Sequence, residues 1–132
     1  MTSDLLVERQ DGVATVTFNR PEVRNAIDYE GWLELGRLAE ELGQDAQVKV
    51  VVFTGQGDEA FSAGADIKDF DRYRTDSTQA KTYADAFEGA VDAIEAIPKP
   101  TMCLVRGYCV GGGCELSLAA DIRVAADNAR FG

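Results

Sequence analysis

Histidine is absent from this 132-residue sequence, and no apolar run is long enough to cross a membrane as a helix. Without an imidazole the chain cannot build a Ser-His-Asp triad unless another chain supplies the histidine. The first ten residues, MTSDLLVERQ, form neither an apolar signal peptide nor an arginine-rich transit peptide. We therefore expect a cytoplasmic protein that does not associate with membranes.

Basic residues are also scarce, because 13 lysines and arginines stand against 23 acids and the net charge is −10. This balance disfavours nucleic acids and anionic membrane surfaces as partners, but it permits an anionic small molecule held by a few local bases. The three cysteines, Cys103, Cys109 and Cys114, lie in an apolar stretch without CxxC spacing. We expect buried, reduced thiols and no metal site.

The sequence does contain enough hydrophobic residues, 45%, for one domain with a core. Alternating apolar and polar residues predict a β-hairpin around Asp11-Gly12. Asp28 is placed to cap a helix that stops at Gly43, and Asp66 is placed to cap a short helix. Strands are expected at 5–9, 13–18, 48–54, 101–105 and 122–125, and helices at 29–42, 67–73, 78–97 and 115–120. This alternation predicts a single α/β domain with crossover connections.

Three consecutive glycines, Gly111 to Gly113, separate the expected strand 101–105 from the expected helix that starts at Glu115. Glycine permits unusual backbone angles and leaves backbone N–H groups open at the positive end of a helix. Such a turn suits an anion or negative charge that develops in a reaction, with Glu115 as a neighbouring acid-base group. A tight packing turn beside a solvated Glu115 is an equally good interpretation of this stretch alone.

A second turn of small residues, Phe61 to Lys68 (FSAGADIK), precedes another expected helix. Two such turns can each offer one N–H group to a single oxygen, which defines an oxyanion hole. Two rival motifs fail in context. The stretch 55–60 matches a dinucleotide fingerprint, but no helix is expected there and its two acids would repel a pyrophosphate. The stretch 60–64 is similar to a nucleophile elbow, which needs the missing histidine.

Together, three segments resemble the crotonase, or enoyl-CoA hydratase/isomerase, family: Asn19–Ala26 (NRPEVRNA), Phe61–Lys68 and Gly107–Ala126 (GYCVGGGCELSLAADIRVAA). Their order and spacing also match, and the resemblance covers essentially the whole chain. It implies an α/β fold in which ββα units repeat as a spiral, and homotrimers that often pair as hexamers. Residues 1–132 would then be the N-terminal part of one acyl-CoA-binding domain, with the C-terminal part absent from this chain.

The resemblance also implies roles for individual residues. The N–H groups of Ala65 and Gly112 would form an oxyanion hole around a thioester carbonyl, and Glu115 matches the first of two hydratase glutamates. The remaining positions implied in CoA or substrate binding are Arg24, Ala26, Ala63, Asp66, Ile67 and Lys68. Among these, Arg24 would approach the CoA phosphates or be a plain surface base. A helix cap is favoured for Asp66, and a solvated side chain for Lys68.

The resemblance implies hydration of a 2-enoyl-CoA to a 3-hydroxyacyl-CoA, with no cofactor beyond the CoA part of the substrate. The second glutamate of the family would lie beyond Gly132, so an isomerase, a dehydratase and a CoA-thioester hydrolase stay open. A non-catalytic acyl-CoA-binding protein is a further alternative. Phe70 and Tyr73 have helical spacing, which favours core packing over a role in lining an acyl pocket.

Overall fold

The computed structural model describes residues 4–73 and 75–132, apart from the side chain of Phe70. It contains two sheets, one of five strands in the order β1-β2-β3-β5-β7 and one of three strands in the order β4-β6-β8. The strands are β1 Leu5–Gln10, β2 Val13–Phe18, β3 Val50–Gly55, β4 Ala60–Ser62, β5 Thr101–Val105, β6 Tyr108–Cys109, β7 Ile122–Ala125 and β8 Arg130–Phe131. The helices are η1 Pro21–Val23, α1 Tyr29–Gln44, α2 Ile67–Tyr73, α3 Ser77–Glu95 and α4 Gly112–Ala119.

From β3 onward the strands come in consecutive pairs, namely β3 and β4, β5 and β6, and β7 and β8. The first strand of each pair joins the larger sheet and the second joins the smaller one. The strands β3, β5 and β7 run parallel in the larger sheet, while β4, β6 and β8 run parallel in the smaller one. Helices α2 and α3 follow the first of these pairs, and α4 follows the second. The molecule is therefore an α/β protein that grows by repeated ββα steps, as the resemblance implied.

The chain enters the larger sheet through the expected hairpin of β1 and β2, which pair antiparallel from Leu5↔Phe18 to Gln10↔Val13. Its two turn residues, Asp11 and Gly12, have φ of 53° and 83°. Positive φ at both central residues matches the right-handed twist of the flanking strands, so the turn fixes the register.

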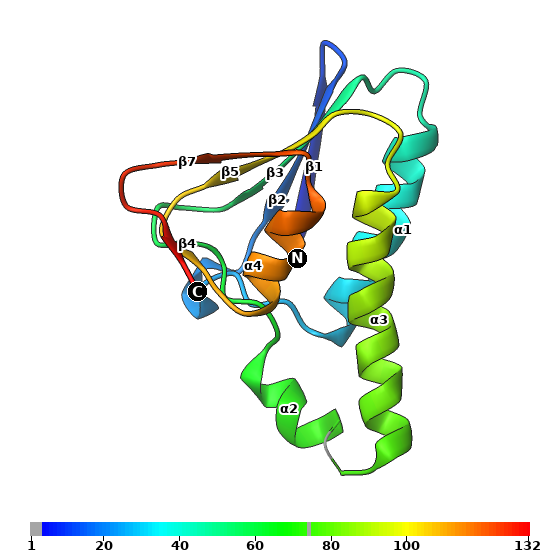
Figure 1. Ribbon diagram of the computed structural model, residues 1–132, viewed down its shortest axis with the longest axis vertical. Helices are drawn as coiled ribbons and strands as arrows, with labels where there is room; N and C mark the ends of the chain where they lie inside the picture. Colours follow the sequence, from blue (N-terminus) through cyan, green and yellow to red (C-terminus); the bar gives the residue numbers. More distant parts are fainter. Residues whose placement is uncertain (1–3, 74) are drawn as a thin grey trace.

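Helices α1 and α3 lie side by side along one flank of the molecule (Figure 1). They approach closely because Gly36 faces Ala90, whose Cα would lie only 3.6 Å from a Cβ placed on the glycine. The buried side of α1 includes Trp32, Leu35 and Leu42, whose spacing is that of one face of a helix.

The ends of α1 confirm one expectation and correct another. Asp28 caps its start, since its side chain accepts a hydrogen bond of 2.8 Å from the Gly31 N–H. The expected stop at Gly43 is wrong, because α1 runs on to Gln44. A Cβ at Gly43 would lie 3.3 Å from Cδ of Pro98, so close packing, rather than helix termination, calls for glycine there.

Other boundaries differ from expectation by a few residues. The strand expected at 48–54 is found at Val50–Gly55, and the helix expected at 78–97 is found at Ser77–Glu95. Helix α4 begins at Gly112 rather than at Glu115. The glycine turn is thus the first turn of the helix itself, so Glu115 is the fourth residue of the helix rather than its first.

Two of the three thiols are buried as expected, while Cys114 is only half-buried, and all three are free. Burial raises the pKa of Cys103 to about 12 and that of Cys109 to about 11. These thiols stay protonated at neutral pH and behave as small core residues. None of the helices within the described ranges combines the length and apolar character needed to span a bilayer.

Candidate functional site

The first two sequence motifs are joined by backbone hydrogen bonds. The Ala63 N–H donates to the Arg24 carbonyl over 2.9 Å, and the Ile27 N–H donates to the Gly64 carbonyl over 2.7 Å. The Asp66 N–H in turn donates to the Ile27 carbonyl over 3.0 Å. The segment after η1 and the segment after β4 therefore form one rigid unit, although nearly 40 residues separate them.

The glycine turn of the third motif packs on the same segment. The Val110 N–H donates to the Ser62 carbonyl over 3.2 Å, and a Cβ placed on Gly64 would lie 2.6 Å from the Gly112 nitrogen. A Cβ on Gly113 would overlap the Ser62 carbonyl oxygen. Glycine at 64 and 113 is therefore required by the close approach of two backbones, which brings all three motifs together.

The N–H groups of Ala65 and Gly112 both lie at this junction. Ala65 forms a parallel bridge with Ile27, in which the neighbours of Ala65 make the hydrogen bonds and its own N–H faces away. Gly112 is the first residue of α4, so its N–H has no acceptor within the helix. Within residues 4–73 and 75–132, neither N–H donates to a protein acceptor. Their convergence on one oxygen stays a prediction.

Glu115 lies in the first turn of α4, where its backbone N–H donates to the Gly111 carbonyl over 3.1 Å. Its side chain is exposed and makes no hydrogen bond or ion pair with any residue that the structure describes. A carboxylate with this freedom can exchange a proton with water or a ligand, so its placement is compatible with acid-base chemistry. Its role stays a prediction.

Asn25 is a structural residue of the site that the sequence analysis did not single out. It is 1% exposed, and its φ of 57° is a left-handed conformation that asparagine tolerates better than most residues. Its side-chain oxygen accepts from the Arg20 N–H over 2.9 Å, and its Nδ2 donates to the Ala60 carbonyl over 2.8 Å. Asn25 therefore ties the end of β2 to the start of β4.

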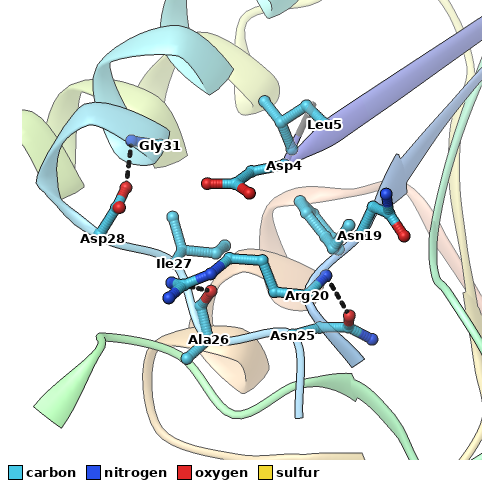
Figure 2. A pocket seen from close by; sticks show the side chains of 10 residues that line it. Asp4, Leu5, Asn19, Arg20, Asn25, Ala26, Ile27, Asp28 and Gly31 are labelled. Atoms are coloured by element: carbon cyan, nitrogen blue, oxygen red, sulfur yellow. Dashed lines mark hydrogen bonds between the residues drawn. The ribbon is translucent and has the colours of Figure 1, made fainter. Parts of the chain in front are cut away.

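Arg20 is a second residue that the sequence analysis missed. Figure 2 shows its side chain running along the 25–27 segment, where Nη1 donates to the Ala26 carbonyl over 3.0 Å. The pocket drawn there has a volume of about 10 Å³, which is room for roughly one water molecule. It is therefore too small for an acyl group. Nothing in the sequence distinguished Arg20 from Arg24, since both flank the same turn.

Asp66 acts as the expected helix cap and also forms an ion pair. Its Oδ1 accepts from the Lys68 N–H over 3.0 Å, and its Oδ2 lies 3.1 Å from Nη1 of Arg20. Burial by itself would raise the pKa of this carboxyl, but the Lys68 N–H and the Arg20 guanidinium outweigh burial and lower the pKa. A carboxylate held ionised by two partners is suited to fixing the start of α2.

The remaining predicted binding residues surround this junction. The Arg24 guanidinium lies 4.6 Å from the centre of the Tyr108 ring, and its Nε is 3.0 Å from Oε1 of Glu59. The Ile67 side chain is 78% exposed, unusual for isoleucine, and the exposed Lys68 side chain has no ion-pair partner among the described residues. The structure thus brings the backbones of these residues together, and their contacts with CoA stay predictions.

Tyr73 packs in an aromatic cluster, as helical spacing favoured, with its ring stacked 5.2 Å from that of Tyr29. The expectation for Phe70 lies outside the described residues, because its side chain is not described. Trp32 is fully buried in the core.

Repeated ββα steps, with loops of small residues meeting where two helices begin, define a spiral α/β class of protein. Comparisons with known proteins narrow the class. The family model for enoyl-CoA hydratase/isomerase matches residues 8–132. The chain is 34% identical over 130 residues to the short-chain-enoyl-CoA hydratase of Clostridium acetobutylicum, covering 98% of this chain and 49% of that protein. It is 33% identical over 129 residues to the crotonyl-CoA hydratase of Syntrophomonas wolfei, with coverage of 98% and 49%.

Solved structures agree with this assignment. The crystal structure of an enoyl-CoA hydratase/carnithine racemase from Magnetospirillum magneticum matches with a TM-score of 0.94 and 38% identity. That match covers 100% of this chain and 49% of the other. The chain belongs to the enoyl-CoA hydratase/isomerase, or crotonase, family. It spans about half the length of the curated relatives that it matches.

Proposed function

We propose that this chain forms part of an enzyme that binds an acyl-CoA thioester and stabilises its enolate between the N–H groups of Ala65 and Gly112. The reaction proposed is the reversible hydration of a 2-enoyl-CoA to a 3-hydroxyacyl-CoA. The observation that carries this proposal is the junction of the three motifs, where both N–H groups lack a protein acceptor within the described residues. The names of the relatives, short-chain-enoyl-CoA hydratase and crotonyl-CoA hydratase, point to the same substrate class.

The chemistry follows from polarisation of the thioester carbonyl. Two N–H donors on the carbonyl oxygen draw electron density from the conjugated double bond, so water can add at C3 and the charge moves onto the oxygen. The Glu115 carboxylate accepts a proton from that water as the water oxygen bonds to C3. A proton from Glu115 or from a second acid then adds to C2 as the enolate collapses, so that one water molecule is added in all. Losing one oxyanion donor typically costs about 10²–10³ in rate, and general acid-base help contributes about 10²–10⁴, so both elements matter.

The proposal extends to binding and assembly. The CoA portion would contact the residues around the junction, with Arg24 and Lys68 as the bases for its phosphates and the backbone of residues 63–67 beside the adenine. No cofactor beyond CoA and no metal is proposed. The enzyme would be cytoplasmic. It would form homotrimers or hexamers, and sedimentation of the protein would measure this oligomeric state.

Two measurements test the proposed function. Loss of the conjugated absorbance of 2-butenoyl-CoA reports hydration, and deuterium uptake at C2 of butanoyl-CoA in D₂O reports enolate formation. Both signals together would support a hydratase. Deuterium uptake without hydration would indicate another enolate reaction, such as isomerisation. Tight binding without either signal would leave an acyl-CoA-binding protein, and the absence of binding would contradict the proposal.

A further inference from the structure

Gly112 rests directly on two aromatic side chains of the flanking helices. A Cβ placed on Gly112 would lie 3.1 Å from Cε2 of Phe87 and 3.5 Å from Cζ2 of Trp32. The two rings themselves meet edge to face, with centroids 4.8 Å apart and planes at 87°. The residue that presents the candidate N–H group therefore has α1 and α3 as its support.

A hydrogen bond fixes the orientation of this support. Trp32 is fully buried, and its indole Nε1–H donates to the Tyr83 hydroxyl over 2.9 Å. An indole has only this one donor, and leaving it unpaired in the core is unfavourable, so the bond holds the ring in one place. The Phe87 ring, packed against Trp32, is held with it.

The same aromatic cluster extends toward the other candidate donor. The Tyr83 ring lies 5.4 Å from that of Tyr73 on α2, the helix that starts two residues after Ala65. Tyr29, at the start of α1, stacks on Tyr73, and its backbone N–H donates to Asp69 of α2 over 2.7 Å. One aromatic cluster thus contacts both the helix after Ala65 and the Gly112 turn.

We infer that Tyr83, Trp32 and Phe87 are positioning residues for the Gly112 N–H, and that the Tyr83–Trp32 hydrogen bond sets where this donor lies. The inference rests on the proposed function, because it gives these residues a task only if Gly112 polarises a substrate carbonyl. Hydrogen bonds weaken steeply with misalignment, and a displacement of about 1 Å can cost as much as about 10²-fold in rate. The competing interpretation is plain core packing, in which loss of these contacts lowers stability alone.

Two hydroxyl deletions separate the interpretations. Tyr83→Phe removes the acceptor of the Trp32 indole and keeps the ring. Tyr29→Phe is the matched control, because no described residue hydrogen-bonds to the Tyr29 hydroxyl. We expect Tyr83→Phe to lower kcat about tenfold with KM nearly unchanged, and Tyr29→Phe to stay within about twofold of the parent. The infrared stretch of a ¹³C-labelled thioester carbonyl should be less red-shifted on binding to Tyr83→Phe, which shows weaker polarisation.

A compensating pair gives an independent test. Gly112→Ala keeps the N–H but pushes its methyl group against the Phe87 ring edge, so we expect about a tenfold loss of kcat. Adding Phe87→Leu removes that ring edge and should return kcat to within about threefold of the parent, more than the two single effects predict. Simply additive losses would contradict the inference. So would a Tyr83→Phe protein that is less stable but has unchanged kcat and carbonyl frequency.

Failure of the inference and failure of the proposed function give different results. If the parent protein shows neither hydration nor deuterium uptake, the proposed function fails. If the parent turns over and Tyr83→Phe behaves as Tyr29→Phe does, only the inference fails. The amide resonance of Gly112 in the ligand-free protein adds a readout without turnover, since it should move in Tyr83→Phe and not in Tyr29→Phe.

Discussion

Main-chain N–H groups, rather than side chains, are the donors proposed at Ala65 and Gly112, so ordinary side-chain truncation cannot remove them. Glycine at 64 and 113 is required by direct contact between backbones, whereas a Cβ placed on Gly112 would make its closest contact, of 3.1 Å, with the Phe87 ring. Gly112 is also the first residue of α4, where proline is well tolerated because the N–H is unpaired in any case. This makes one substitution unusually informative.

Gly112→Pro deletes the N–H while keeping a helix-compatible residue, and we expect it to abolish turnover, a loss of at least about 10²–10³. Steady-state hydration and calorimetric binding of an acyl-CoA measure the effect, and circular dichroism checks that the fold is intact. Gly112→Ala serves as the control, since it keeps the N–H and should lose far less. Retained activity in a folded Gly112→Pro protein would remove Gly112 from the oxyanion hole.

Glu115→Gln keeps the size of the side chain and removes its charge. We expect acyl-CoA binding to persist and hydration to fall at least about a hundredfold, because an amide cannot accept the proton from water. Kd from calorimetry and kcat from the absorbance assay separate the two effects. An equal loss of both would instead give Glu115 a structural role, although its exposed side chain argues against one.

At the scale of elements, the start of α2 holds two carboxylates whose protonation has opposite effects on stability. The pKa of Asp69 is raised, first by burial and then by the charges of Asp28 and Asp66, although the Tyr29 N–H opposes this. The pKa of Asp66 is lowered, as described above. Asp69 therefore stabilises the fold at pH values below 3.8, the ordinary pKa of an aspartate, and this contribution is lost as the pH rises through the raised pKa of the folded protein. Asp66 stabilises the fold at pH values above 3.8, and this contribution is lost as the pH falls through the lowered pKa of its carboxyl.

Replacing each acid with asparagine should reveal this difference. At pH 7 we expect Asp66→Asn to lower the free energy of unfolding by about 1–3 kcal/mol, because a charge-assisted pair with Arg20 is lost. Asp69→Asn should leave it unchanged or raise it, since an amide oxygen can still accept from Tyr29. Urea unfolding at pH 7 and at pH 3 measures both, and the differences from the parent should shrink at pH 3. Parallel behaviour of the two variants at pH 7 would contradict the assignment.

The longer elements could be predicted from the sequence because their apolar residues show a periodic or continuous pattern, and Asp28 and Asp66 mark the starts of α1 and α2. The hairpin, α1, α2, α3, β5 and β7 all appear where apolar spacing placed them, within a few residues. Strands β4, β6 and β8 were not predicted, since two or three residues are too few to show a period. The start of α4 was missed because glycine is a poor helix former. The presence of Gly113 in the first turn is explained by its close packing against the Ser62 carbonyl, which the sequence does not reveal.

The site was predicted in the same uneven way. The two turns followed from motifs of small residues that are visible in the sequence, whereas Ala65 and Gly112 themselves were implied by the family resemblance. Asn25 and Arg20 hold those motifs in place through contacts with residues as far away as Ala60 and Asp66. Such long-range contacts have no local signature. Turns of small residues can therefore be recognised in a sequence, whereas the distant side chains that hold those turns in place cannot.

At the scale of the whole molecule, each of the two sheets ends at an open edge strand. Strand β7 is the last of the five-stranded order and β8 the last of the three-stranded order, and every residue of both is exposed. Large apolar side chains are exposed on both strands, namely Ile122 and Val124 on β7 and Phe131 on β8, and Leu118 is exposed on α4, the helix that precedes β7 in the chain. In a structure built from stacked repeats, an apolar terminal face is unstable in water unless something covers it.

We expect the 132-residue chain by itself to associate through this open end. The net charge of −10 opposes association, but the repulsion is screened beyond about 8 Å at physiological salt, whereas burial of apolar edge residues acts on contact. Association should therefore strengthen as salt is raised, which sedimentation velocity over a range of protein and salt concentrations would measure.

Substitution identifies the edge responsible. Ile122→Lys combined with Val124→Lys should weaken association at least about tenfold, because it places two charges on the face that would be buried. Val13→Lys combined with Val23→Lys adds the same charge at exposed valines outside β7 and should change association little. Equal effects of the two pairs would mean that net charge alone governs association. If the chain stays a monomer at high salt, the apolar edge is stable in water. The prediction that this edge drives association would then be wrong.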